Sequence, residues 1–239
     1  MSPKYERFAA SQPDFIAASI GGSAFHPDRL NIDFIKDLAD FFQELLAQKK
    51  TIFAVVGGGG KARSLEEDVK TLGVRRAKAV DQIGIAVTQV NALVLQKYLE
   101  ARDIDFRCYS DGDLLKRGAG VIYVQGGSDP GHTTDFVTIQ ASHEAGQEVV
   151  LNISTEPGGI NPRRGGEIIE NELIEQMTWD EYFRIFPKEH KPGSHSPFDG
   201  PAALFAQKHK MTAILVGPDM NNLRKCLRGE EFRGTIVHP

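Results

Sequence analysis

The sequence predicts an α/β fold, in which a mainly parallel sheet lies between two layers of helices. Short β-branched or aromatic runs alternate along the chain with longer segments whose apolar residues recur at helical spacing. Three of the short runs end in glycine clusters, as buried strands do when they lead into tight turns. Such alternation is typical of parallel strands joined by helices that cover both faces of the sheet.

The expected elements account for most of the chain. The expected strands are 15–20, 51–56, 106–109, 121–125, 148–154, 212–216 and 235–238. The expected helices are 31–50, 61–72, 83–102, 134–146, 202–208 and 221–228, with a helix-like piece near 111–117. Segments 156–166 and 187–201 are expected to be long loops, which in compact domains are usually functional or mobile. No linker separates two halves, so we expect a single domain over residues 1–239.

The composition indicates a globular protein and does not exclude a small anionic ligand. The chain of 239 residues has 41% hydrophobic and 25% charged residues, and its formal net charge of −4 disfavours nucleic acid or an anionic membrane surface. No apolar run approaches the ~20 residues that span a membrane. Cys108 and Cys226 lack metal-ligand or redox spacing, so we expect two reduced thiols in a cytoplasmic protein, with a disulfide as the alternative.

The three glycine clusters predict a binding site for a phosphate-rich ligand. They occupy residues 21–23, 57–60 and 126–128, each directly after an expected strand. Ligands of open α/β sheets bind beyond the carboxyl ends of the strands, where glycines let the backbone approach an anion. The alternative is that these glycines only make tight turns. Neither the P-loop nor the dinucleotide fingerprint is present, so the pattern predicts phosphate binding without defining the chemistry.

Several motifs resemble the archaeal-type uridylate (UMP) kinases of the amino-acid-kinase superfamily. They are Ser-Ile-Gly-Gly-Ser at 19–23, Val-Val-Gly-Gly-Gly at 55–59 with Ala-Arg at 62–63, and Asp-Gln-Ile-Gly-Ile at 81–85. The most specific is Gly-Gly-Ser-Asp-Pro-Gly-His-Thr-Thr-Asp at 126–135. The similarity runs over nearly the whole chain.

The resemblance implies a three-layer α/β/α sandwich that transfers a phosphoryl group from ATP, with Mg²⁺, to UMP or a related small acceptor. It implies an acceptor-side half at about 14–150 and a donor-side half at about 151–239. It also implies a homo-oligomer, a hexamer or a dimer, in cytoplasmic pyrimidine metabolism. No residue is expected to ligate a metal directly.

The resemblance also implies roles for particular residues. The expected acceptor-binding residues are Gly57, Gly58 and Arg63 for the phosphate, Asp81 for the ribose, and Thr133 and Thr134 for the uracil and phosphate. Those expected near the transferred phosphates and the catalytic centre are Gly21, Gly22, Ser23 and Asp135. The alternative interpretations are helix caps for Asp81, Thr133, Thr134 and Asp135, and a solvated side chain for Arg63.

The sequence departs from the family at several places that matter for catalysis. Ser19 and Leu204 stand where many relatives carry lysine, and Lys61 is one residue later than the lysine of archaeal relatives. The segment 155–164 lacks the acidic residue, the aromatic residue and the Asp-Pro pair of the family. Lys208 and Arg163 are candidates to supply the missing positive charge on the ATP side.

Three hypotheses remain open on the sequence alone. The first is an ATP-dependent kinase acting on UMP. The second is a non-catalytic oligomer that binds a nucleotide or another oxyanion for regulation or storage. The third retains the kinase chemistry with a different acceptor, for which the 187–201 segment is the place of change.

Overall fold

The structure is a computed structural model that describes residues 14–109, 115–155, 157–164, 167–170, 172–189 and 196–239. In chain order the first half contains β1 (Phe15–Ile20), α2 (Gly22–Phe25), α3 (Ile32–Ala47), β2 (Thr51–Val56), α4 (Gly59–Thr71), α5 (Ala77–Ala101), β3 (Phe106–Cys108), β4 (Ile122–Gln125) and α6 (Thr134–Glu144). The second half contains β5 (Val149–Ile153), β6 (Arg163–Arg164), β7 (Glu167–Ile168), β8 (Gln176–Thr178), α7 (Trp179–Ile185), α8 (Gly200–Lys208), β9 (Thr212–Val216), α9 (Met220–Leu227) and β10 (Gly234–His238).

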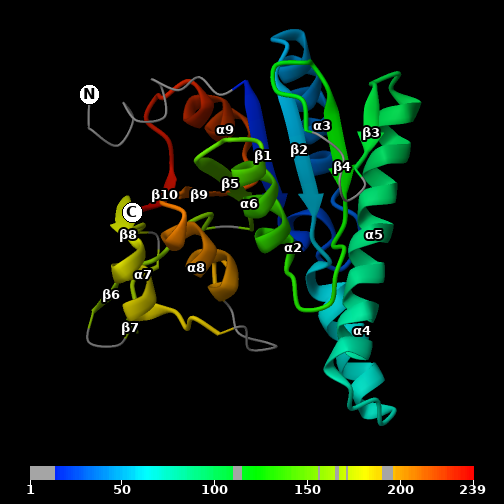
Figure 1. Ribbon diagram of the computed structural model, residues 1–239, viewed down its shortest axis with the longest axis vertical. Coiled ribbons are helices and arrows are strands. Elements are labelled where there is room, and N and C mark those ends of the chain that lie inside the picture. Colours follow the sequence, from blue (N-terminus) through cyan, green and yellow to red (C-terminus); the bar gives the residue numbers. More distant parts are fainter. Residues whose placement is uncertain (1–13, 110–114, 156, 165–166, 171, 190–195) are drawn as a thin grey trace.

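One eight-stranded sheet runs through the structure in the order β3-β4-β2-β1-β5-β9-β10-β8 (Figure 1). Every neighbouring pair is parallel except β9 and β10, which are antiparallel. Strands β6 and β7 form a separate two-stranded hairpin. The expected α/β fold with a mainly parallel central sheet is therefore confirmed.

Helices cover both faces of the sheet and divide the apolar core into two clusters. Side chains of β1 alternate, because successive residues of a strand point to opposite faces. Ile16 and Ile20 pack with residues of α3, α5 and α9, whereas Phe15 and Ala17 pack with residues of α6, α7 and α8. The three layers therefore consist of two helical layers with the sheet between them.

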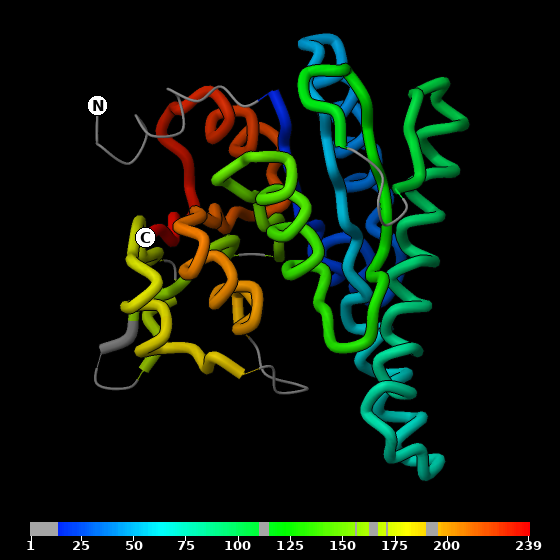
Figure 2. Tube along the Cα trace, viewed as in Figure 1, coloured from blue at the N-terminus to red at the C-terminus, as the bar shows by residue number. Residues whose placement is uncertain are grey.

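Helix α4 and the first turns of α5 extend beyond the carboxyl ends of the strands as a two-helix arm (Figures 1 and 2). We define this arm as α4 together with residues 77–85 of α5. The two helices are joined at residues 72–76, where Gly73 adopts a φ of 97°, a conformation that glycine accepts without strain. Within the described part of the chain, no helix is both long and apolar enough to cross a membrane.

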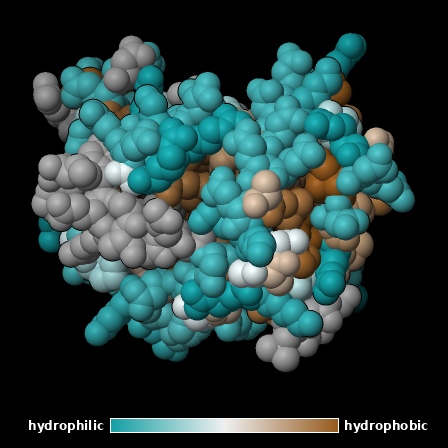
Figure 3. All heavy atoms as spheres, turned by 90° about the horizontal axis from the view of Figure 1, so that it is seen from above, coloured by the Kyte–Doolittle hydropathy of each residue, from teal (hydrophilic) through white to brown (hydrophobic). Residues whose placement is uncertain are grey.

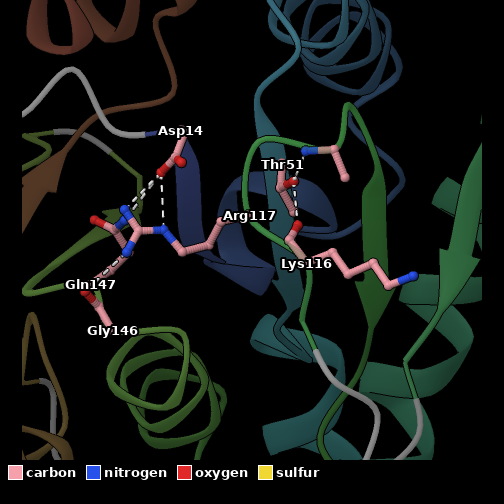
Figure 4. Close-up of polar contacts among 7 residues, drawn as sticks. Asp14, Thr51, Lys116, Arg117, Gly146 and Gln147 are labelled. Carbon is pink, nitrogen blue, oxygen red and sulfur yellow. Dashed lines mark hydrogen bonds and ion pairs between the residues drawn. The ribbon is translucent and has the colours of Figure 1, made fainter.

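The opposite end of the sheet, at the amino ends of the strands, is fastened by polar contacts (Figure 4). Arg117 donates to Asp14 through Nε and Nη2, at 3.1 and 2.8 Å. Thr51 donates to the carbonyl oxygen of Lys116 at 2.6 Å and accepts from the backbone of Ala119. These bonds hold the connection before β4 against the starts of β1 and β2. Seen from this end, the surface is mostly hydrophilic, with hydrophobic side chains visible between polar ones (Figure 3).

One expected helix boundary was wrong, and three elements were missed. Helix α5 begins at Ala77, six residues before the expected start, because residues 77–82 include good helix formers such as alanine, lysine and glutamine outside the apolar repeat. Residues 167–186 were given no element, yet they contain β7, β8 and α7. The Thr178-x-x-Glu181 capping box, which the structure contains, was a readable signal for α7. The helix expected near 111–117 lies mostly outside the described residues, and 115–117 are not helical.

Tyr182 of α7 anchors the segment that leads into α8. Its hydroxyl donates to the carbonyl oxygen of Phe198 and accepts from the backbone N–H of Phe198 at 3.1 Å. The ring is fully buried. One side chain therefore satisfies both backbone groups of a buried residue next to Asp199, the N-cap of α8.

We predict that Tyr182→Phe lowers the free energy of unfolding by about 1–3 kcal/mol, because both backbone groups of Phe198 lose their partner while the ring volume stays the same. Urea denaturation followed by circular dichroism measures the change. The control is Tyr98→Phe, since the Tyr98 hydroxyl only accepts from Arg102 near the surface. Equal stability of Tyr182→Phe and the unsubstituted protein would contradict the prediction.

Candidate functional site

The first two glycine turns lie against each other at the carboxyl ends of β1 and β2. A Cβ atom on Gly22 would lie 2.0 Å from the backbone nitrogen of Gly59 and 2.6 Å from the carbonyl carbon of Gly57. Real Cβ atoms do not approach backbone so closely, so only glycine fits at position 22. Gly59 itself has a φ of 64°, which also favours glycine.

Helix α5 fastens the second and third glycine turns. The backbone N–H of Gly127 donates to the hydroxyl of Thr88 at 2.7 Å, and the amide of Asn91 donates to the carbonyl oxygen of Gly57 at 2.8 Å. A Cβ on Gly126 would lie 2.6 Å from the backbone nitrogen of Gln89. The three turns therefore form one rigid edge, which the sheet order places beside β5.

A pocket of about 560 Å³ opens between α4, the first half of α5 and the 127–134 loop. Five of the expected acceptor residues line it, namely Gly58, Arg63, Asp81, Thr133 and Thr134. Its lining also includes polar residues for which the sequence predicted no role, namely Glu66, Lys70, Arg75, Thr88 and Asp129. This volume lies within the range of small-molecule sites.

Two of the lining residues hold neighbouring segments in place. Arg63 donates to the hydroxyl of Ser23 at 3.3 Å, which connects α4 to the first glycine turn. Asp81 accepts from the backbone N–H of Gly131 at 3.0 Å, which connects α5 to the third loop. Because α5 begins at Ala77, Asp81 lies within the helix, and the alternative that it caps this helix is wrong. Thr133 both lines the pocket and caps α6, by accepting from the backbone of Phe136.

Asp135, which directly follows Thr134 in α6, is held by three donors. The Ser19 hydroxyl and the Asn152 amide donate to Oδ1 at 2.7 and 2.8 Å, and the backbone N–H of Asp199 donates to Oδ2 at 3.1 Å. Ser19 and Asn152 are register partners on the parallel strands β1 and β5, so both side chains reach the same face. Three neutral donors thus hold the Asp135 carboxyl group.

Desolvation by burial raises the pKa of Asp135 to about 6. The hydrogen bond from Ser19 opposes this increase, whereas the nearby Asp199 carboxylate adds to it. Asn152 is 4% exposed, and its Oδ1 has no hydrogen-bond partner within the described residues. Leaving such an oxygen buried costs about 1–3 kcal/mol, so the orientation of the amide is dictated by its bond to Asp135.

Of the two expected donor-side residues, Lys208 lies at the far end of α8 from Asp199. Lys208 is exposed at the last position of α8, nine residues after Asp199, or about 13 Å along the helix axis. Leu204 is 38% exposed on the same helix. The side chain of Arg163 lies outside the described residues. Asn152 was missed as a candidate, because strand register cannot be read from one sequence.

Comparisons with known proteins agree with this geometry. The profile of the amino acid kinase family matches residues 14–217. The uridylate kinase of Haloarcula marismortui is 31% identical over 229 residues, covering 94% of this chain and 98% of the relative. The uridylate kinase of Thermococcus onnurineus is 32% identical over 234 residues, covering 94% and 99%. The chain therefore belongs to the amino acid kinase family.

Solved structures show the same fold. The crystal structure of uridylate kinase from Archaeoglobus fulgidus superimposes with a TM-score of 0.70 at 24% identity, covering 93% of this chain and 99% of that one. The UMP kinase from Bacillus anthracis gives 0.71 at 16% identity, covering 95% and 96%. Within its family, the protein is thus uridylate-kinase-like in sequence and fold.

We predict that the stability of the protein relative to Asp135→Asn falls by roughly 2–3 kcal/mol between pH 4 and pH 7. The folded-state pKa of about 6 lies above the ordinary value of 3.8, so the folded protein retains a proton that the unfolded chain releases. This contribution is fully present below pH 4 and is lost as the pH rises through 6. Asparagine does not titrate. Urea denaturation of both proteins at each pH measures the difference, and a pH-independent difference would refute the prediction.

Proposed function

We propose that the protein transfers a phosphoryl group from ATP to UMP, or to a closely related small phosphate, bound in the pocket. The observation that carries this proposal is the segment 133–135, where two pocket-lining threonines are followed directly by Asp135. The acceptor pocket and the carboxylate centre therefore meet at the N-terminus of α6. Sequence similarity to uridylate kinases over nearly the whole chain supports the choice of acceptor.

On the acceptor side, the residues present suit a phosphate. Arg63 supplies a cation, and the glycines at the start of α4 supply backbone N–H groups at a helix N-terminus, where anions are favoured. Asp81 holds the 127–134 loop over the pocket. These groups would orient the acceptor phosphate toward the first glycine turn, which Arg63 contacts through Ser23.

On the donor side, phosphoryl transfer needs in-line positioning and neutralisation of charge on the transferred group. Mg²⁺ would supply much of this neutralisation. Among the described residues no group of three or more His, Cys, Asp or Glu side chains could hold a metal ion, and in this proposal the triphosphate carries the magnesium. The role of Asp135 is to hold Ser19, Asn152 and the start of α8 in fixed positions around the reacting groups.

A homo-oligomer is also part of the proposal. Val90 and Leu93 of α5, three residues apart and so on one face of the helix, are 57% and 50% exposed. A second copy of the chain would bury them.

The experiment that tests the function is phosphorus NMR of the purified protein with Mg-ATP and UMP. We expect conversion of UMP to UDP, and a loss of at least about 100-fold in kcat for Asp135→Asn. Other nucleoside monophosphates and small phosphates serve as a comparison panel. Tight UMP binding without any transfer would favour the non-catalytic alternative, for which the relatives give no support.

We predict that Arg63→Ala weakens UMP binding about 10- to 100-fold, because a charge-assisted bond to the phosphate is lost. Isothermal titration of UMP measures the change. Arg228→Ala is the matched control, since Arg228, the C-cap of α9, pairs with Glu230 just after the helix, and neither residue lines the pocket. Equal affinity of Arg63→Ala and Arg228→Ala for UMP would show that Arg63 does not hold the phosphate.

A further inference from the structure

Helices α6 and α8 pack against each other and are in contact at both of their ends. At the amino ends, the backbone N–H of Asp199, the N-cap of α8, donates to Asp135 in the first turn of α6. At the carboxyl ends, His143 lies in the last turn of α6 and His209 is the C-cap of α8. The centroids of these two imidazole rings are 4.2 Å apart. We call His143 and His209 the histidine pair.

Phe205 of α8 contacts both rings of the histidine pair. It stacks on His209 with a centroid separation of 4.3 Å and meets His143 edge to face at 5.6 Å. Among the described residues neither imidazole forms a hydrogen bond, so the ring nitrogens are available to a ligand. His143 is exposed and His209 is half-buried, so an ion in solution reaches the pair.

The surroundings of the histidine pair favour a cation that binds neutral imidazole. The pair lies at the carboxyl ends of two helices, where unpaired backbone carbonyl groups carry partial negative charge. Burial, together with the neighbouring His143 and Lys208, lowers the pKa of His209, so its ring is neutral at pH 7. The Lys208 ammonium group opposes a second cation, whereas the exposed carboxylate of Glu144, next to His143, attracts one.

The geometry points to a binding site for one divalent transition-metal ion of the Zn²⁺, Ni²⁺ or Cu²⁺ type, with one ring nitrogen each from His143 and His209. Neutral imidazole is a preferred ligand of all three ions. Two nitrogens bound to one Zn²⁺ ion lie about 3 Å apart. Rings with centroids 4.2 Å apart can present one nitrogen each at this separation, after small rotations of two accessible side chains. Water completes the coordination.

A metal ion in this position would join the carboxyl ends of α6 and α8, whose amino ends are already joined by the bond from Asp199 to Asp135. It would stabilise the folded chain, because the unfolded chain does not hold the two imidazoles together. The site does not depend on the proposed phosphoryl transfer, since neither histidine lines the pocket.

The test is isothermal titration of the full chain with ZnCl₂ at pH 7.5. For the unsubstituted protein we expect saturable binding that MgCl₂ does not reproduce. His143→Gln and His209→Phe should each weaken Zn²⁺ binding at least about tenfold, since even the loss of a group behind a metal ligand commonly costs that much. Phenylalanine at position 209 retains a ring to stack on Phe205, so a loss of affinity in this variant reports on the nitrogen rather than on packing.

The controls are Cys108→Ser and His238→Ala, because both residues offer a metal-binding group elsewhere on the chain. Both variants should bind Zn²⁺ at the histidine pair as tightly as the unsubstituted protein. Thermal denaturation gives a second measurement. A saturating excess of Zn²⁺ should raise the Tm of the unsubstituted protein by several degrees at pH 7.5, and it should not do so at pH 5, where both imidazoles are protonated.

Unchanged Zn²⁺ affinity in the double variant His143→Gln/His209→Phe would overturn the inference, because other groups would then hold the ion. Absence of saturable Zn²⁺ binding by the unsubstituted protein would overturn it as well. A rise in Tm that is equally large in the double variant would show that the histidine pair does not join the two helices through the metal. None of these results bears on the proposed function, which is tested by conversion of UMP.

Discussion

The close approach of two backbone turns is the constraint on which the rest of the site depends. Gly22 touches the 57–59 turn so tightly that no side chain fits between them. This contact fixes the ends of β1 and β2 relative to each other, and thereby the direction in which α4 leaves the sheet. The pocket wall formed by α4 and the bond from Arg63 to Ser23 both follow from this arrangement.

The second feature that defines the centre is a buried carboxyl group held by neutral donors. Asp135 receives two side-chain hydrogen bonds and one backbone bond, which fix its position but do not balance its charge. The raised pKa is the physical consequence, because a carboxylate surrounded by neutral donors is less stabilised than one beside a cation. A charged ligand bound close to Asp135 would therefore change the ionisation of this carboxyl group.

The fold could be predicted from the sequence because its signals are local. Strand runs, helical periodicity and the three glycine clusters gave most elements, and Thr133 and Asp135 lie where the motif suggested, at the start of α6. The partners of Asp135 could not be predicted, because Ser19, Asn152 and Asp199 come from three elements that only the sheet order and register bring together. The antiparallel β10 and the place of Glu66 over Gly84 also depend on tertiary packing. Lys208 lies at the far end of α8 from Asp199, and its role on the donor side stays a prediction.

Helix α5 both holds the glycine turns and presents an exposed apolar face, and the same two turns of the helix contribute to both. Thr88 and Asn91 secure the glycine turns from one side of the helix, while Val90 and Leu93 are exposed on the other. A neighbouring molecule that packed on Val90 and Leu93 would therefore act on the same two turns of helix that fix the ligand-binding edge. By linkage, any effect of that packing on ligand affinity is reciprocal, so ligand binding would change the strength of association by the same factor. A partner bound to this face of α5 would therefore be placed to influence the ligand-binding edge directly.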